Sequence, residues 1–184
     1  CPKGEPITVK VSGGDLIVDL VGTYTGSDAT PATEGLFVPM ASPTRVVDTR
    51  VAALNPLGGT TRAQPGWRFE VPVATIPALG ASSISAVVLN ATTADTITTG
   101  YISVGTAGAV DPATKPSTST MNIARPAQTL ANHAIVPVSA RGFSMFAEAG
   151  GNLIADLAGY FIGGAAPAQF GPPSNAASPA CTTP

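Results

Sequence analysis

Proline and glycine recur along this chain at intervals too short for long helices. Its 184 residues include 18 prolines and 20 glycines, and both residue types destabilise a helix interior. No window of a dozen residues keeps an apolar i, i+3, i+4, i+7 stripe without such a break. The segments between the breaks are short and rich in β-branched or alternating residues, as is typical of strands. The sequence therefore predicts an all-β fold.

The predicted strands are short and follow one another closely. Residues 85–89 are apolar throughout, which indicates a strand in the middle of a sheet. Besides the strands, we expect one short helical turn near residues 126–131. This pattern predicts a single β-sandwich or jelly-roll-like domain. The predicted strands are residues 7–11, 15–24, 67–73, 84–91, 101–104, 133–138, 143–147 and 152–162.

One segment of the chain occurs twice. Residues 13–26 match residues 150–163 at an offset of 137, with eight of fourteen positions identical. Each copy opens on Gly-Gly followed by Asp or Asn, which is a tight-turn signal. We therefore expect each copy to be the second strand of a β-hairpin, with residues 6–12 and 142–149 as the first strands.

The repeat and the local composition predict four parts. Two alternatives remain for the origin of the first copy: it is an integral part of this fold, or it is the end of a preceding repeat in a tandem array. It packs either on its own chain or on another chain. The parts are an N-terminal accessory β-hairpin at 1–26, a linker at 27–35, the sandwich domain at 36–163 and a Pro/Ala/Ser-rich tail at 164–184.

The two cysteines, Cys1 and Cys181, lie near opposite ends of the chain. A disulfide within one chain would join the termini, which often lie close together in domains. The alternatives are bridges between neighbouring copies, a lipid on Cys1, or free thiols. The first expectation is an intrachain disulfide in an extracellular protein.

Charge excludes one class of partner. Only 11% of residues are charged, the formal net charge is −2, and no run of Lys or Arg occurs. Nucleic-acid binding would need a basic stripe, so we expect no nucleic-acid partner. No segment has the length of apolar residues needed to span a bilayer, and we expect no membrane span.

Five stretches of residues 36–163 follow one another in a recognisable order. They are residues 43–50 (PTRVVDTR), 87–92 (VVLNAT), 100–104 (GYISV), 119–122 (STMN) with 131–132 (AN), and 156–161 (DLAGYF). Through them, residues 36–163 resemble a repeat domain of secreted and cell-wall-associated actinobacterial proteins, with the pattern PxRxxDTR … VLNxT … GYxxV … VDVxGYF. This resemblance implies an extracellular accessory role and no reaction. The early copy of the closing segment and the terminal cysteines depart from the family pattern.

Arg45, Asp48 and Arg50 form the richest polar cluster. On a regular strand Arg45 and Asp48 would point to opposite faces, whereas Asp48 and Arg50 would share one. One interpretation is a site that binds sugar or an anionic polymer, with Trp67 as a stacking platform beside Tyr24, Tyr101 and Tyr160. The other is a part-buried Asp–Arg network that fastens an irregular segment to the sheet, with the aromatic residues in the core.

Catalytic and metal-binding patterns are weak. Asp19 and Asp156 occupy equivalent positions in the two copies, so a structural partner explains them better than glycoside hydrolysis does. His133 is the single histidine, and no G-x-S-x-G motif accompanies it. Asp95 and Asp111 match no calcium loop. We expect no catalytic residues, no metal and no cofactor.

Three asparagines remain as polar candidates in the predicted loops or strand ends. Their side chains can cap turns or bind sugar hydroxyls. They are Asn90, Asn122 and Asn132.

Together these features predict a non-enzymatic extracellular or cell-surface domain with a structural or display role. One variant is a self-assembling subunit that uses the extra hairpin or the tail to pair with a sheet edge of a neighbouring copy or another surface protein. The alternative is a carbohydrate-binding module that attaches a secreted protein to cell-wall glycan.

Overall fold

The computed structural model describes residues 8–10, 12–13, 16, 18, 34–80 and 83–165. The chain divides into two units, Cys1–Ala32 and Thr33–Pro184. In the first unit, the described side chains of Val9, Leu16 and Val18 are exposed to solvent. Most of the predicted N-terminal hairpin, most of the linker and tail, Cys1 and Cys181 lie outside the described residues.

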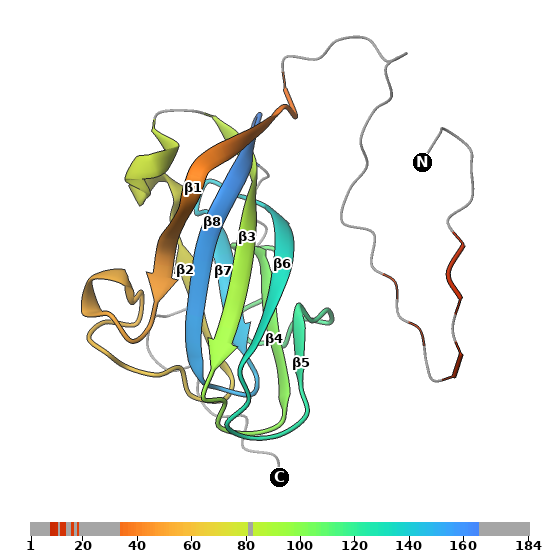
Figure 1. The fold of residues 1–184 in the computed structure, drawn as a ribbon. Helices are drawn as coiled ribbons and strands as arrows, with labels where there is room; N and C mark the ends of the chain where they lie inside the picture. The colour runs from red at the N-terminus through yellow and green to blue at the C-terminus, as the bar shows by residue number, and fades with distance from the viewer. Residues whose placement is uncertain are drawn as a thin grey trace. The chain divides into compact units, whose positions relative to one another are not determined.

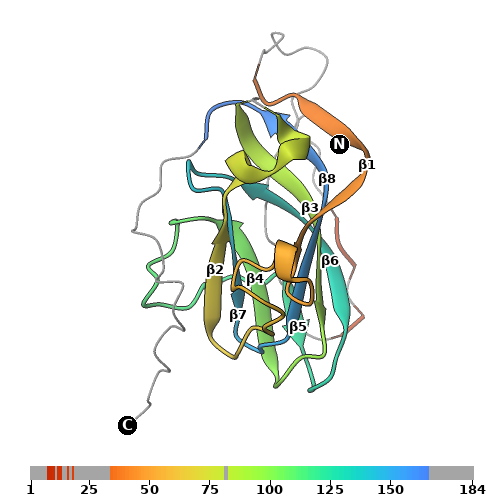
Figure 2. The ribbon, with the colours of Figure 1, turned by 90° about the vertical axis from the view of Figure 1, so that its left-hand side faces the viewer.

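The second unit contains two four-stranded sheets in which every paired neighbour is antiparallel. The sheets lie face to face, as the two views show (Figures 1 and 2). The predicted β-sandwich is confirmed. The first sheet has the order β1 (Phe37–Asp48), β8 (Asn152–Ile162), β3 (Ile84–Ala94), β6 (Leu130–Pro137), and the second has β2 (Trp67–Val71), β7 (Phe143–Ala147), β4 (Gly100–Thr106), β5 (Met121–Ile123).

The core lies between the two sheets and follows the period of two expected of half-buried strands. On β8 the residues Leu153, Ala155 and Leu157 are fully buried, and on β7 so are Phe143, Met145 and Ala147. These alternate residues belong to one continuous apolar cluster. By the same alternation, the residues between them lie on the outer faces of the sheets.

The connection from β7 to β8 differs from the predicted hairpin. β7 pairs with β2 and β4, whereas β8 pairs with β1 and β3 in the other sheet. The Gly150–Gly151 step is therefore a corner that crosses the sandwich. Both glycines are buried, and a Cβ on Gly150 would lie 2.9 Å from atoms of Pro65 and Ile97. A hairpin turn would lie at the surface, so the hairpin prediction is wrong for this copy.

Strand β1 was not among the predicted strands. It contains Pro39 and Pro43, and prolines remove donors from a ladder. The strand tolerates them because it lies at the edge of its sheet and because its register against β8 shifts between Pro39 and Thr44. The short strand β5 was also missed.

The helical turn predicted near residues 126–131 is absent from the described structure, where a turn precedes β6. Short 3₁₀ helices lie elsewhere in the second unit. They are η1 (Ala52–Leu54), η2 (Val73–Thr75) and η3 (Pro77–Leu79).

Candidate functional site

Four charged side chains form what we call the β1 cluster: Arg45, Asp48, Arg50 and Asp156. Arg45 donates to both carboxylate oxygens of Asp156, from Nε at 2.9 Å and from Nη2 at 3.2 Å. Its Nη1 donates to Asp48 Oδ2 at 3.1 Å. Arg50 donates to both oxygens of Asp48, from Nε at 2.9 Å and from Nη2 at 2.8 Å. The four groups form one continuous chain of ion pairs.

A β-bulge brings Arg45 and Asp48 together. The register of β1 against β8 shifts between Arg45 and Val47, so that Arg45 lies opposite Asp156 and Val47 lies opposite Ala155. An extra residue in one strand reverses the alternation beyond it. Residues three apart thus reach the same face, and the prediction that Arg45 and Asp48 point to opposite faces is wrong. The structure contains an Asp–Arg network that fastens this segment of β1 to the sheet.

Asp48 is the electrostatic centre of the β1 cluster. Its side chain is 2% exposed, whereas those of Arg45 and Arg50 are 43% and 47% exposed. The side-chain hydrogen bonds from Arg50, with its backbone N–H and the two positive charges, lower the pKa of Asp48 to about 2. The pKa of Arg45 is raised, chiefly by its hydrogen bonds with Asp156. A carboxylate held this firmly in its charged form is a poor proton donor or acceptor near neutral pH.

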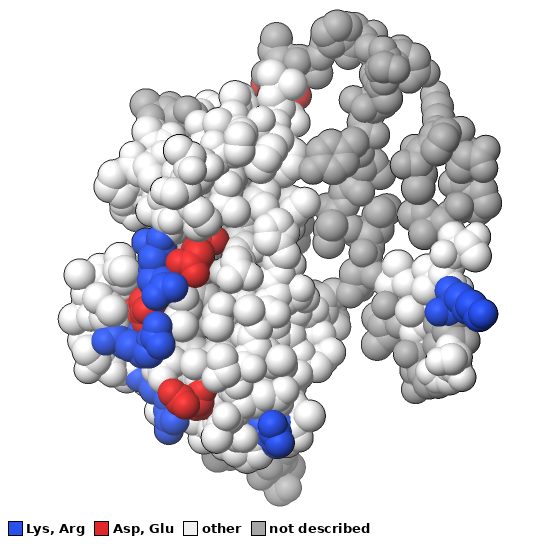
Figure 3. Space-filling view, viewed as in Figure 1, with Lys and Arg blue, Asp and Glu red and all other residues white. Residues whose placement is uncertain are grey.

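The β1 cluster continues into a polar row across the first sheet. Asp156 pairs in register with Asn90 on β3, and Asn90 pairs with His133 on β6. Asn90 and His133 are exposed; Asn90 lies within a strand, not at the strand end we expected. In the space-filling view of this face, charged side chains gather toward the β1 side, and most of the surface is uncharged (Figure 3).

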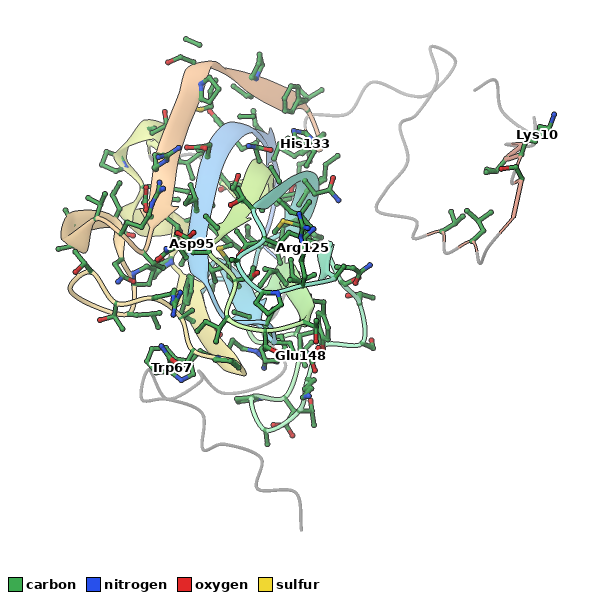
Figure 4. All side chains as sticks on the ribbon, turned by 60° about the horizontal axis from the view of Figure 1, so that its bottom comes forward. Lys10, Trp67, Asp95, Arg125, His133 and Glu148 are labelled. Carbon is green, nitrogen blue, oxygen red and sulfur yellow. The ribbon has the colours of Figure 1, made fainter. Side chains whose placement is uncertain are left out.

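Trp67 does not join the other predicted site residues. It begins β2 in the second sheet, and its partly buried ring packs against the core. Figure 4 shows it well separated from His133. The structure therefore brings together Arg45, Asp48 and Arg50 but places Trp67 elsewhere. Among the predicted stacking residues, Tyr160 also packs against the core, and Tyr24 lies outside the described residues.

A pocket of about 190 Å³, which we call the loop pocket, lies on the outer face of the second sheet. Its floor consists of two registered rows of side chains across β2, β7 and β4. The first row is Arg68, Phe146 and Ser103, and the second is Glu70, Ser144 and Gly105.

Residues 107–120 form the wall of the loop pocket. Arg68 holds this loop by donating to the carbonyl oxygens of Asp111 at 3.1 Å and Thr114 at 2.8 Å. Its guanidinium also lies over the ring of Phe146, 5.3 Å from the centroid. Burial lowers the pKa of Arg68. The Tyr101 hydroxyl fastens the same loop by donating to Pro116 O at 2.6 Å.

The sequence contained only part of the signal for the loop pocket. The alternation of residues 68–71 places Arg68 and Glu70 on one outer face. Nothing local shows that residues more than forty positions away fold back over that face. The carboxylate of Glu70 is held in an ion pair, because Arg141 donates to its two oxygens at 2.9 and 2.6 Å.

The remaining predictions concern metal binding, Asp111 and membrane spans. Within the described part of the chain, no three His, Cys, Asp or Glu side chains gather as a metal site would require. Asp111 accepts from the N–H of Ala113 in a local turn. No helix among the described residues is long and apolar enough to cross a membrane.

No family model, curated protein or solved structure matches this chain. The resemblance to actinobacterial surface repeats stays a prediction that rests on the quoted sequence stretches alone.

Proposed function

We propose that this chain is a non-enzymatic structural or surface-display domain of an extracellular protein, and that it assembles with neighbouring copies through open sheet edges. One observation carries the non-enzymatic part. The carboxylates of Asp48, Asp156, Glu70 and Glu148 each accept hydrogen bonds from an Arg or Lys of the same domain. Acid–base catalysis needs a carboxylate that can exchange its proton with substrate, and these groups instead link strands and loops.

The extracellular location is supported by sequence alone. It follows from the resemblance to secreted repeats and from the pair of cysteines near the two ends of the chain. A mass measurement under reducing and non-reducing conditions tests whether Cys1 and Cys181 are joined in one chain.

The assembly part is supported by the exposed edge of the first sheet. β6 is the last strand of that sheet, and no described strand pairs with its other side. Its eight residues, Leu130–Pro137, contain no Lys, Arg, Asp or Glu. Natural edge strands that avoid pairing usually carry such charges, or prolines within the strand. The opposite edge, β1, is interrupted by Pro39 and Pro43, so β6 is the edge better suited to pairing.

Light scattering on the purified chain over a range of concentrations tests this proposal. We expect a mass that rises with concentration and a fall to the monomer mass in Ala131→Lys, which places a charge on the exposed part of β6. Ala41→Lys on the interrupted edge β1 is the matched control and should assemble as the natural chain does. A strictly monomeric natural chain at high concentration would reject assembly.

The loop pocket supports a second candidate, a carbohydrate-binding domain. Its volume is below the ~300–1,000 Å³ of pockets for drug-sized ligands, which suits a ligand the size of one sugar ring. The hydroxyls of Ser103, Ser144 and Thr118 line it beside the Phe146 ring. The loop pocket is an alternative to the predicted sugar site of Arg45, Asp48, Arg50 and Trp67, in which the tryptophan lies in the other sheet from the strand that ends at Asp48.

Glycine positions provide a clean test of this alternative. A Cβ on Gly105 would meet no atom within 4 Å, so Gly105→Leu should fill the loop pocket without distorting the fold. Gly164, equally unobstructed and outside the pocket lining, gives the control variant Gly164→Leu. Saturable binding on a glycan array that Gly105→Leu abolishes and Gly164→Leu retains would establish the carbohydrate-binding function; no saturable binding by the natural chain would exclude it.

A further inference from the structure

The loop pocket is lined by an arginine that has no carboxylate partner. Arg68 makes no ion pair with any residue that the structure describes, whereas Arg45, Arg50 and Arg141 each pair with a carboxylate of the domain. Hydrogen bonds with aspartate raise the pKa of Arg45 and Arg50, whereas burial lowers the pKa of Arg68. A partly buried positive charge is unfavourable without a counter-ion, so an anion beside Arg68 would be stabilised.

The guanidinium of Arg68 also keeps one edge open. Its hydrogen bonds to the carbonyl oxygens of Val110, Asp111 and Thr114 all come from Nη1 and Nη2. Arginine has five N–H donors, and the Nε–H of Arg68 donates to no residue that the structure describes. Nη2 carries two hydrogens and makes a single bond. The Nε side of this guanidinium therefore remains available to a ligand.

The domain itself shows what this edge binds. Arg45, Arg50 and Arg141 each donate from Nε and Nη2 to the two oxygens of one carboxylate, at distances between 2.6 and 3.2 Å. Such bidentate pairs are among the strongest hydrogen-bonded contacts in proteins. A carboxylate is thus the group that fits the open edge of Arg68.

The carboxylates near the loop pocket leave its positive charge in place. Arg68 and Glu70 are the two charged residues that line it, and Arg141 neutralises Glu70 by donating to both its oxygens. Asp111 is outside the lining, and its carboxylate accepts from the N–H of Ala113. An anion that enters the pocket therefore meets one guanidinium charge that no lining carboxylate offsets.

A hydroxyl without a partner lies in the same row of the pocket floor. Ser103 is 5% exposed and lines the pocket, and its hydroxyl forms no hydrogen bond with a residue that the structure describes. The Phe146 ring lies between Ser103 and Arg68 in register. The row therefore presents a cation, an apolar ring and an open hydroxyl in that order. A sugar acid carries the complementary groups, namely a carboxylate, ring C–H groups and hydroxyls.

From these features we infer that the loop pocket binds a sugar acid, a single hexose ring that carries a carboxylate. The carboxylate pairs with the open edge of Arg68, the ring lies on Phe146, and a sugar hydroxyl bonds with Ser103. This inference rests on the second candidate function, carbohydrate binding, and deepens it by naming the class of sugar. An inorganic or acyclic anion would use Arg68 and leave Ser103 without a partner.

The test compares D-glucuronate with D-glucuronamide, which has the same ring but a neutral amide in place of the carboxylate. Each is titrated into the isotope-labelled natural chain, and the NMR signals of the Arg68 Nε–H and of residues 107–120 are followed. D-galacturonate and its amide cover a second ring configuration. Acetate and inorganic phosphate measure anion binding without a sugar.

We expect saturable binding of a sugar acid, about tenfold tighter than that of its amide, because the charged pair is lost in the amide. The Arg68 Nε–H signal should shift with the same saturation curve. Acetate and phosphate should not saturate these signals over the same range of concentration.

Two variants separate the contacts. Arg68→Met should abolish the preference for acid over amide, whereas a loosened loop alone would weaken both ligands equally. Ser103→Ala should weaken both by about threefold to tenfold and keep the preference. Arg125→Met, outside the pocket lining, is the control and should bind as the natural chain does.

The inference is overturned by equal affinity for acid and amide, by a preference that survives Arg68→Met, or by acetate or phosphate binding as tightly as the sugar acid. Binding of neutral sugars that Gly105→Leu abolishes, without preference for an acid, would reject this inference and leave the carbohydrate-binding function standing. Absence of binding by every sugar, acidic or neutral, would reject both.

Discussion

The β1 cluster and the loop pocket lie on different sheets of one domain, and each fastens a segment of chain to its own sheet. Their electrostatic arrangements are opposite. In the β1 cluster the buried group is a carboxylate, Asp48, and the guanidiniums that bind it are half-exposed. Beside the loop pocket the central group is a guanidinium, Arg68, which binds carbonyl oxygens of a loop instead of a carboxylate. The difference teaches that acid removes the acceptor charge at the centre of the first cluster but leaves the acceptors of Arg68 unchanged, because a carboxylate titrates in the acidic range and a backbone carbonyl does not.

The largest expected effect is from removing the charge of Asp48. Asp48→Asn leaves two guanidiniums beside a neutral amide that has one acceptor oxygen instead of two. We expect a loss of about 2–3 kcal/mol in the free energy of unfolding, below the full range for buried ion pairs because both arginines reach solvent. Asp156→Asn is the matched control, since its side chain is 20% exposed, and it should lose about 1 kcal/mol at most. Equal losses in urea unfolding would contradict the central role of Asp48.

Acid should reproduce most of that loss in the natural chain. The pKa of Asp48 is about 2 in the folded state and about 3.9 in unfolded chains. A lowered folded-state pKa contributes stability above pH ~4, and this contribution, about 2–3 kcal/mol, is lost as pH falls from about 4 to about 2. The natural chain and Asp48→Asn should therefore converge in stability near pH 2. A stability difference that stays constant from pH 6 to pH 2 would refute this.

A smaller effect is expected from the second cluster. Arg68→Met keeps an apolar stem on Phe146 but removes the hydrogen bonds to the loop carbonyls, at a cost of about 1–2 kcal/mol. Hydrogen exchange should rise in residues 107–120, and most of the stability loss should persist at pH 3, because the carbonyl acceptors of Arg68 do not titrate. Arg125→Met is the control, because the Arg125 side chain makes no ion pair or hydrogen bond with any residue that the structure describes. If the loss at Arg68 disappeared between pH 6 and pH 3, the contrast between the clusters would fail.

The smallest effect is expected where an ion pair lies at the surface. Lys115 and Glu148 are 2.6 Å apart but 57% and 26% exposed, so Lys115→Met should change the free energy of unfolding by less than about 0.5 kcal/mol. High salt should leave that small difference within error. A loss above about 1 kcal/mol in thermal or urea unfolding would show that this contact fastens the loop as strongly as Arg68 does.

Several strands were predictable because their signals are local. Strands β7 and β8 have the predicted bounds, since each combines alternation with glycine at its ends. Strand β1 was not predictable, because Pro39 and Pro43 are compatible with a strand only at an edge with shifted register. The same limit applies to the Gly150–Gly151 corner, since a hairpin turn and a crossing between sheets use the same residue types.

The candidate site was predictable to a lesser degree. The motif at residues 43–50 indicated a polar cluster, and in the structure ion pairs join Arg45, Asp48 and Arg50. Their connection to Asp156 depends on the alignment of β1 with β8, and the loop pocket depends on a loop folding over the second sheet. Neither has a signature within a short window of sequence.

By itself, the sequence determined the all-β class and the positions of most strands, because proline, glycine and alternating apolar residues act on the backbone near them. Only the tertiary structure decided which sheet each strand joins and which charges meet. Arg45 and Asp156 are 111 positions apart, and Arg68 and Thr114 are 46 apart. Such contacts form because packing the apolar faces together aligns distant strands, and no local pattern records that alignment.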